Sequence, residues 1–160
     1  MAEVPECEVD EQELESARAL AWRALNRRDH TKGELRTRLE GRAVGPSAVA
    51  SVLAELSKLG YLDDERYAQR FAEDRRRLDG WGRERIERRL RELGVGPEEI
   101  AHALAGQDHD GESAAAAELL RRRFPGSIEG DRERDRALRL LVRRGYGLEL
   151  AHDAIRAHAG

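Results

Sequence analysis

Arginines recur at helical spacing beside aromatic residues in the segment GYLDDERYAQRFAEDRRR, residues 60–77. A helix advances by about 100° per residue, so the segment predicts two adjacent stripes. The basic stripe contains Arg66, Arg70 and Arg77. The apolar stripe, expected to face the core, contains Tyr67, Phe71 and Leu78. Guanidinium groups bind phosphates and carboxylates through paired N–H donors, so this pattern favours recognition of an anionic partner.

Two later segments contain similar stripes. In residues 83–93, the expected inward face contains Ile86, Leu90 and Leu93, and the opposite half contains Arg85, Arg88 and Arg91. In residues 132–144, four arginines fall within roughly 60° of one another on a helix. They are Arg132, Arg136, Arg139 and Arg143, and the expected inward residues are Leu138, Leu141 and Val142. A solvent face of arginines paired with neighbouring carboxylates is the alternative interpretation. Recurrence of the stripe favours a surface for a long, acidic, repetitive partner such as nucleic acid or a nucleoprotein filament.

No residue pattern predicts catalysis or a bound cofactor. The five histidines are scattered, and none shares a helix face with a second ligand at metal-binding spacing. The carboxylates of the two middle helical segments alternate with arginines, as in solvated ion pairs rather than an acid–base pair. We therefore expect neither an enzyme nor a metal or cofactor site.

The composition predicts an all-α protein. Charged residues make up 38% of the 160 residues and aromatic residues only 4%, and no segment alternates apolar and polar residues for long enough to indicate a strand. The net charge is −3, but residues 1–15 contain seven acids and no Lys or Arg. The remainder holds 25 acids against 29 bases, which leaves a mildly basic body.

The first 13 residues are predicted to form an acidic disordered arm. It contains Cys7, the single cysteine, so no disulfide can form within the chain, as is usual in a reducing cytoplasm. No apolar run approaches 18 residues, so we expect no membrane segment, and we expect a cytoplasmic monomer.

The rest of the chain repeats itself with a period of 51 residues, without gaps. Residues 34–53 match residues 85–104 at apolar and turn positions, and residues 135–155 continue the series less closely. Each copy is predicted to contain helix, helix, glycine turn and helix. Expected boundaries are 14–60, 61–109 and 110–160. One such unit cannot bury its apolar face alone, so the three are expected to stack into an elongated, curved rod.

Several helix starts can be placed from capping residues. Thr31 followed by Glu34 is a capping box for a helix near 32–40. Pro46 suits the first position of a helix near 46–59. Asp63 and Asp64 provide the N-cap and first-turn negative charge of the helix near 63–78.

Three motifs together resemble the bacterial RecX family, regulators of the RecA recombinase. They are RRDHTKGELRTRL (27–39), GYLDDERYA (60–68) and GWGRERIERRLRELGV (80–95). The run RGYGLELAHDAI (144–155) is similar to the family's closing segment. The resemblance extends over about residues 15–157, although the acidic arm lies outside the family core and the third copy departs around Leu148.

The resemblance implies three tandem three-helix repeats that bind along the groove of the RecA–DNA filament. It implies suppression of filament growth, ATPase and strand exchange, with weak, sequence-nonspecific binding to single- and double-stranded DNA. Two alternatives remain at this point. One is a helix–turn–helix-like DNA-binding protein acting without RecA, which Glu98 and Glu99 at the start of a would-be recognition helix disfavour. The other is a purely structural helical adaptor.

Overall fold

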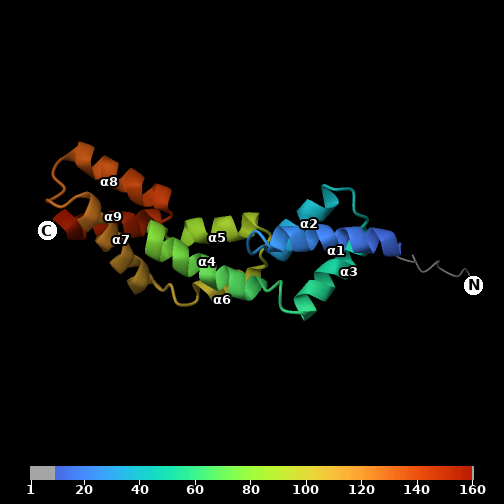
Figure 1. Cartoon of the computed structure of the whole chain (residues 1–160). Coiled ribbons are helices and arrows are strands. Elements are labelled where there is room, and N and C mark those ends of the chain that lie inside the picture. Colours follow the sequence, from blue (N-terminus) through green and yellow to red (C-terminus); the bar gives the residue numbers. More distant parts are fainter. Residues whose placement is uncertain (1–9, 160) are drawn as a thin grey trace, which may run out of the picture. The chain divides into compact units, whose positions relative to one another are not determined.

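The computed structural model describes residues 10–159, and all regular structure in this part of the chain is helical (Figure 1). The helices are α1 (Glu11–Leu25), α2 (Lys32–Glu40), α3 (Pro46–Lys58), α4 (Asp64–Asp79), α5 (Arg83–Glu92), α6 (Pro97–Leu104), α7 (His109–Arg123), α8 (Asp131–Arg144) and α9 (Leu148–Ala159). They follow one another in three sets of three. The prediction of an all-α fold built from tandem three-helix sets is confirmed.

The predicted capping residues start their helices as expected. The Thr31 hydroxyl accepts a hydrogen bond from the Glu34 backbone N–H at 3.0 Å, and the Glu34 carboxylate accepts one from the Thr31 N–H at 3.0 Å. Asp63 accepts from the Arg66 N–H at 3.0 Å ahead of α4. Pro46 opens α3, where its missing N–H removes no helical hydrogen bond.

Helix α1 begins three residues earlier than the sequence predicts. Asp10 caps it by accepting from the Gln12 N–H at 3.1 Å. The Glu13 carboxylate accepts from the Gly45 N–H at 2.6 Å, which ties the start of α1 to the start of α3. Residues 11–13 are therefore helical, and their assignment to the acidic arm is wrong. The predicted disorder of residues 1–9 lies outside the described residues.

Alanine, rather than the larger apolar residues, forms the most deeply buried face of several helices. In α4 the fully buried residues are Ala68 and Ala72, whereas Leu78 is 67% exposed. In α8 the fully buried residues are Ala137 and Leu141, whereas Val142 is 46% exposed. The inward assignments of Leu78 and Val142 are therefore wrong. A methyl side chain contributes little to a hydrophobic pattern, but it allows two helices to approach closely.

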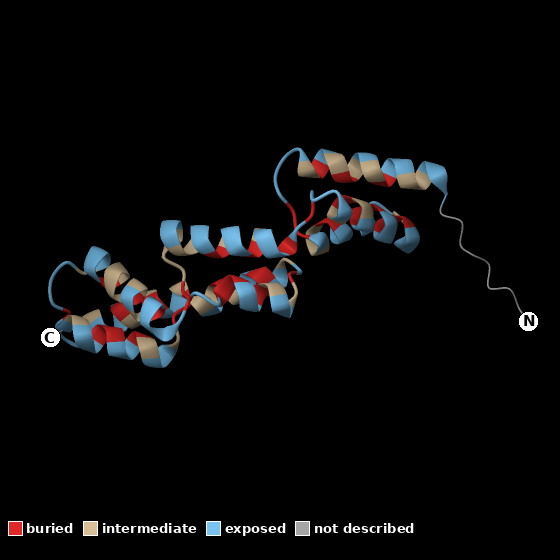
Figure 2. Ribbon diagram, turned by 90° about the horizontal axis from the view of Figure 1, so that it is seen from below, coloured by how far each residue is buried: buried red, intermediate tan, exposed pale blue. Residues whose placement is uncertain are grey.

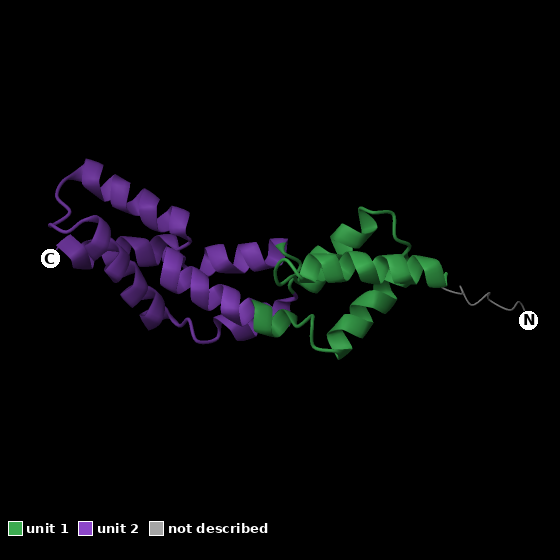
Figure 3. Ribbon diagram, viewed as in Figure 1, with its two compact units in different colours: residues 1–67, 93–95 green, residues 68–92, 96–160 purple. Residues whose placement is uncertain are grey.

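The chain divides into two compact units (Figure 3). The first comprises residues 1–67 and 93–95, and the second comprises residues 68–92 and 96–160. In the first unit α1, α2 and α3 pack on one another around a core that includes Leu35, Leu39 and Val52. In the second unit α9 packs on both α7 and α8, around Leu120, Leu141 and Ile155. Figure 2 shows these buried faces as strips along the helices.

Residues 93–95 belong to the first unit because the start of α2 is seated on the residues that follow α5. The Thr31 hydroxyl donates to the Leu93 carbonyl oxygen. The Lys32 N–H donates to the Asp64 carboxylate at 2.9 Å, so Asp64 caps α2 from the first turn of α4. These contacts join the first set of three helices to the second within one unit. The three-repeat boundaries therefore stay a prediction.

The same arrangement recurs 51 residues later, within the second unit. There the start of α5 is seated on the residues that follow α8. The Gly82 N–H donates to the Arg144 carbonyl at 2.7 Å, and the Arg83 N–H donates to the buried Glu112 carboxylate at 2.8 Å. The Glu84 N–H donates to the Gly145 carbonyl at 3.1 Å. The second helix of each set of three, α2, α5 or α8, is its middle helix. We call each arrangement a seat: the start of one middle helix (α2 or α5) lies on the residues at the end of the next middle helix (α5 or α8).

Each seat requires a glycine with a left-handed backbone conformation: Gly94 after α5 in the first seat and Gly145 after α8 in the second. Gly94 has φ +81° and Gly145 has φ +94°. A Cβ on Gly94 would lie 2.9 Å from the Gly33 Cα, and one on Gly145 would lie 2.3 Å from the Arg85 Cβ. Glycine is needed here for its backbone conformation and also for its lack of a side chain.

Gly145→Ala should therefore destabilise the protein much more than Gly60→Ala. Gly60 also has a left-handed φ, +81°, but a Cβ there meets nothing within 4 Å. The backbone cost of about 1–2 kcal/mol is common to both variants. Overlap with Arg85 adds roughly 1–3 kcal/mol or more only in Gly145→Ala. Urea unfolding followed by circular dichroism measures the difference, and equal losses would contradict the seat.

Candidate functional site

The predicted arginines of α4 are exposed on that helix but do not form one uniform basic stripe. Arg66 donates to the Gly60 carbonyl at 3.1 Å, within the turn before the helix. Arg70 is exposed. The Arg77 guanidinium lies 3.8 Å from the Asp74 carboxylate, and both side chains are exposed. An exposed pair at this distance contributes little to stability, so Arg77 can exchange Asp74 for another anion at small cost.

Of the two predicted arginines in α5, Arg88 is exposed and Arg85 is half-buried. The Arg85 guanidinium lies 4.0 Å from the centroid of the Trp81 ring and donates to the Arg143 carbonyl at 2.9 Å. A carbonyl in the last turn of α8 would otherwise lack a helical partner. Arg85 therefore supports the end of α8, and its predicted role as a binding residue remains a prediction.

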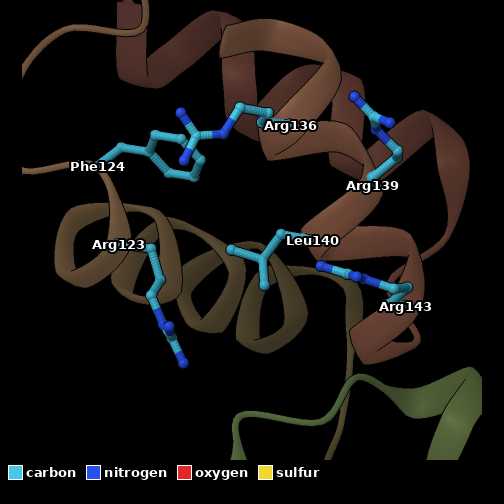
Figure 4. Close-up of a pocket in the computed structure, with 6 residues that line it drawn as sticks. All are labelled: Arg123, Phe124, Arg136, Arg139, Leu140 and Arg143. Carbon is cyan, nitrogen blue, oxygen red and sulfur yellow. The ribbon is translucent and has the colours of Figure 1, made fainter.

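Most of the predicted α8 arginines gather at one hollow. Three of the four predicted residues line a hollow of about 390 Å³ between α8 and the end of α7 (Figure 4). We call it the arginine hollow, and its lining is Arg123, Phe124, Arg136, Arg139, Leu140 and Arg143. Arg132 is exposed on the first turn of α8 and does not line the hollow. Figure 4 shows Arg136 extending toward Phe124 and Arg143 toward Leu140, whereas Arg123 and Arg139 point away from these two residues.

The arginine hollow has a formal charge of +4, and its lining contains no carboxylate. One of its guanidinium groups bonds to the backbone, because the Arg139 Nε donates to the Asp135 carbonyl at 3.2 Å. The two preceding arginines of α7 are instead paired with an acid. Arg121 and Arg122 both donate to Glu118, at 2.7 and 3.0 Å, and these hydrogen bonds hold the pKa of the Glu118 carboxyl below its ordinary value.

A second basic hollow, of about 520 Å³, lies between α4 and α7 in the same unit and shares Arg123 with the first. Arg77 lines it beside the exposed Leu78. The other basic residues of its lining are Arg76, Arg122 and Arg144, and Asp79 and Glu118 are also part of it. Its charge is therefore partly compensated, unlike that of the arginine hollow. A predicted residue from α4 and three from α8 thus line two hollows that meet at Arg123.

Sequence reasoning missed Arg123 and Phe124. Both lie in the run RRRFP, residues 121–125, where three successive arginines precede an aromatic residue and a helix-ending proline. That run is a detectable signal. Its position opposite α8 depends on the loop from Pro125 to Gly130, whose path no helical periodicity predicts.

The arginine hollow can bind an anion of moderate size. Four guanidinium groups offer paired N–H donors to phosphate or carboxylate oxygens, and Phe124 and Leu140 offer an apolar surface between them. Among residues 10–159 no group of three His, Cys, Asp or Glu side chains could hold a metal ion. The same residues contain no helix long and apolar enough to cross a membrane.

The seat beside this site contains a carboxylate in an unfavourable environment. Glu112 is 6% exposed and accepts from the Arg83 N–H and from the Gln107 amide, at 2.8 and 3.2 Å. Burial raises the pKa of the Glu112 carboxyl, and the hydrogen bond from Arg83 only partly opposes this effect. Burial also raises the pKa of the neighbouring Tyr146 hydroxyl to about 12.

The fold and this site together define a helical protein of tandem three-helix sets that offers basic hollows for an anionic partner. Comparison with known proteins identifies the family. The model of the first three-helix domain of RecX matches residues 17–56, and that of the second matches residues 63–104. The chain belongs to the RecX family of regulatory proteins.

Similar relatives include the regulatory protein RecX of Deinococcus radiodurans, 37% identical over 91% of this chain and 70% of the relative. That of Mycolicibacterium vanbaalenii is 36% identical over 89% of this chain and 82% of the relative. The crystal structure of RecX from Lactobacillus salivarius matches with a TM-score of 0.76, covering 91% of this chain and 96% of that one. At 17% identity, it supports the fold alone.

Replacing Glu112 with Gln should make stability less dependent on pH. Because the pKa of Glu112 is raised on folding, its contribution favours the folded state at low pH and is lost as the pH rises through the folded-state pKa. Glutamine can accept the same two hydrogen bonds without a charge. The melting temperature of Glu112→Gln minus that of the parent should therefore increase from pH 4 to pH 7. A constant difference would show that Glu112 ionises as in water.

Proposed function

We propose that this protein regulates the RecA recombinase, mainly as an inhibitor, by binding along the RecA–DNA filament. Membership of the RecX family is the observation that carries the proposal. The basic hollows support it, because a filament of protein on DNA is long, repetitive and rich in phosphate. The protein would act by occupancy rather than catalysis, as a monomer in the cytoplasm.

Several modest contacts along one chain would supply the affinity. Linked contacts raise the effective concentration of one another, so tandem sets can bind a repetitive partner more tightly than any single set. A bound chain would suppress filament growth, ATPase and strand exchange by bridging or obstructing neighbouring recombinase subunits. DNA itself would be an accessory partner, single- or double-stranded and without sequence preference.

A DNA-binding protein that reads base edges without RecA is a weaker proposal. A recognition helix carries donors and amides at its exposed first turns. Helix α6 instead begins with Pro97, Glu98 and Glu99. Two carboxylates at that position would face the phosphates and the electronegative base edges of the major groove, which is unfavourable.

The decisive assay is the ATPase activity of RecA on single-stranded DNA, with this protein added at substoichiometric amounts. We expect inhibition that weakens with added salt, because charged contacts are screened. No inhibition would contradict the proposed function.

The arginine hollow can be tested in the same assay. The triple variant Arg136→Gln, Arg139→Gln, Arg143→Gln should raise the half-inhibitory concentration about tenfold or more, which corresponds to roughly 1.4 kcal/mol. The matched control is Arg89→Gln, Arg121→Gln, Arg156→Gln, which removes three exposed arginines outside the hollow and outside the predicted stripes. Equal effects of the two triples would show that only total charge matters. Melting temperatures of both should stay near that of the parent, because the changes are on the surface.

A further inference from the structure

The arginine hollow combines two features that a purely electrostatic patch does not need. Its lining includes four arginines and no carboxylate, and it also includes the aromatic ring of Phe124. Its volume of about 390 Å³ is within the range of small-ligand sites, roughly 300–1,000 Å³. A ligand that uses both features has an anionic group for the arginines and a planar apolar group for the ring.

Phe124 differs from the other aromatic residues of the described chain. Trp22 packs edge-on against Tyr61, with ring centroids 4.5 Å apart, and Phe71 packs against Trp81 at 6.1 Å. Tyr146 is fully buried and donates to the Gly80 carbonyl. Phe124 is half-buried, has no ring contact with another aromatic residue among residues 10–159, and lines the hollow. Part of its surface is thus left for a planar ligand.

The backbone around Phe124 is held in place. Phe124 ends α7, and its N–H donates to the Leu120 carbonyl at 2.7 Å. The His158 ring of α9 lies 2.9 Å from the Phe124 carbonyl and 3.1 Å from that of Gly126. One edge of the hollow is therefore fixed by α7 and α9, while the other is the helix α8.

We propose that the arginine hollow is a nucleotide subsite for single-stranded nucleic acid. One base stacks against Phe124, and the adjoining phosphates contact Arg136, Arg139 and Arg143. Bases in a single strand expose their faces, whereas those of a duplex are stacked on one another, and basic grooves with aromatic residues bind single strands without sequence preference. The acidic side chains of a protein segment would use the arginines, whereas in a single strand every nucleotide supplies both a phosphate and a planar base.

This subsite rests on the proposed function, to which it adds the place and the base contact of single-strand binding, but its test does not involve the recombinase. Fluorescence anisotropy is measured with labelled 12-nucleotide oligothymidylate and with a sugar–phosphate oligomer of the same length that lacks bases. The parent should bind the oligothymidylate about 5- to 150-fold more tightly, which is the effect of stacking one base. Phe124→Leu should remove this preference, and Phe124→Tyr, which keeps a ring, should retain it.

The contribution of the arginines is measured separately, from the affinity for both oligomers and its dependence on salt. The triple variant Arg136→Gln, Arg139→Gln, Arg143→Gln should weaken binding to both oligomers. It should also reduce the slope of log affinity against log salt by about 0.7 for each phosphate that an arginine no longer neutralises. The control triple Arg89→Gln, Arg121→Gln, Arg156→Gln should change the slope less. Circular dichroism confirms that each variant is folded.

Three results would overturn the subsite. They are equal affinity of the parent for the two oligomers, an unchanged preference in Phe124→Leu, or equal weakening by the two arginine triples. Competition by polyglutamate at the same charge concentration as oligothymidylate, and equally sensitive to the hollow arginines, would assign the hollow to an acidic protein instead. A protein that inhibits RecA but shows no base preference would retain the proposed function and refute the subsite.

Discussion

The rest of the structure depends on one kind of contact, in which a left-handed glycine packs against the first turn of the preceding middle helix. Gly94, after α5, packs against α2, and Gly145, after α8, packs against α5. At Gly94 and Gly145 the two backbones approach so closely that no side chain fits between them. The approach brings backbone N–H groups of α2 and α5 to the carboxylates of Asp64 and Glu112. At the starts of α2 and α5, a backbone N–H that has no partner within its own helix is thus satisfied by a carboxylate of the following set.

The buried polar residues are concentrated at the seats. Those of the described chain are His30, Thr31, Asp64, Gln107 and Glu112, and all five lie at or beside the two seats. Elsewhere the buried surface is apolar and rich in alanine. A buried polar group is costly unless it is hydrogen-bonded, so a misplaced set of helices would forfeit these bonds as well as apolar packing. The seats therefore specify how successive sets join, and the alanine faces add close packing.

The sequence predicts the parts of this fold that depend on local spacing. The capping box at Thr31 and the 51-residue period are local signals, and they locate the helices and the corresponding seats. The sequence does not predict that Asp64 caps α2 from 32 residues away, because the same residue also suits the first turn of its own helix. A hydrophobic pattern misplaces Leu78 and Val142 because it weights leucine and valine above alanine, whereas close packing here favours alanine.

The site follows the same division between local and long-range information. Arg136, Arg139 and Arg143 share a face by helical spacing alone, so the sequence predicts their grouping. Arg123 and Phe124 join them only because α9 packs on both α7 and α8 and the intervening loop returns the chain. Arg85 shows the converse case, since its spacing matches a binding stripe but its guanidinium is engaged by Trp81 and the end of α8.

Two positions that correspond to the seats by the 51-residue period have a different local structure. At the first set, Ala43 occupies the left-handed position of Gly94 and Gly145, with φ +60°, and its methyl group would obstruct a seat. At the last set, α8 starts one turn earlier than its counterparts, and the Arg134 N–H bonds to the Gly130 carbonyl. In α2 and α5 the corresponding N–H donates to a carboxylate of the following set. The backbone N–H that α2 and α5 donate to the following set is therefore bonded within the first turn of α8 itself, so the start of α8 forms no seat with the described residues.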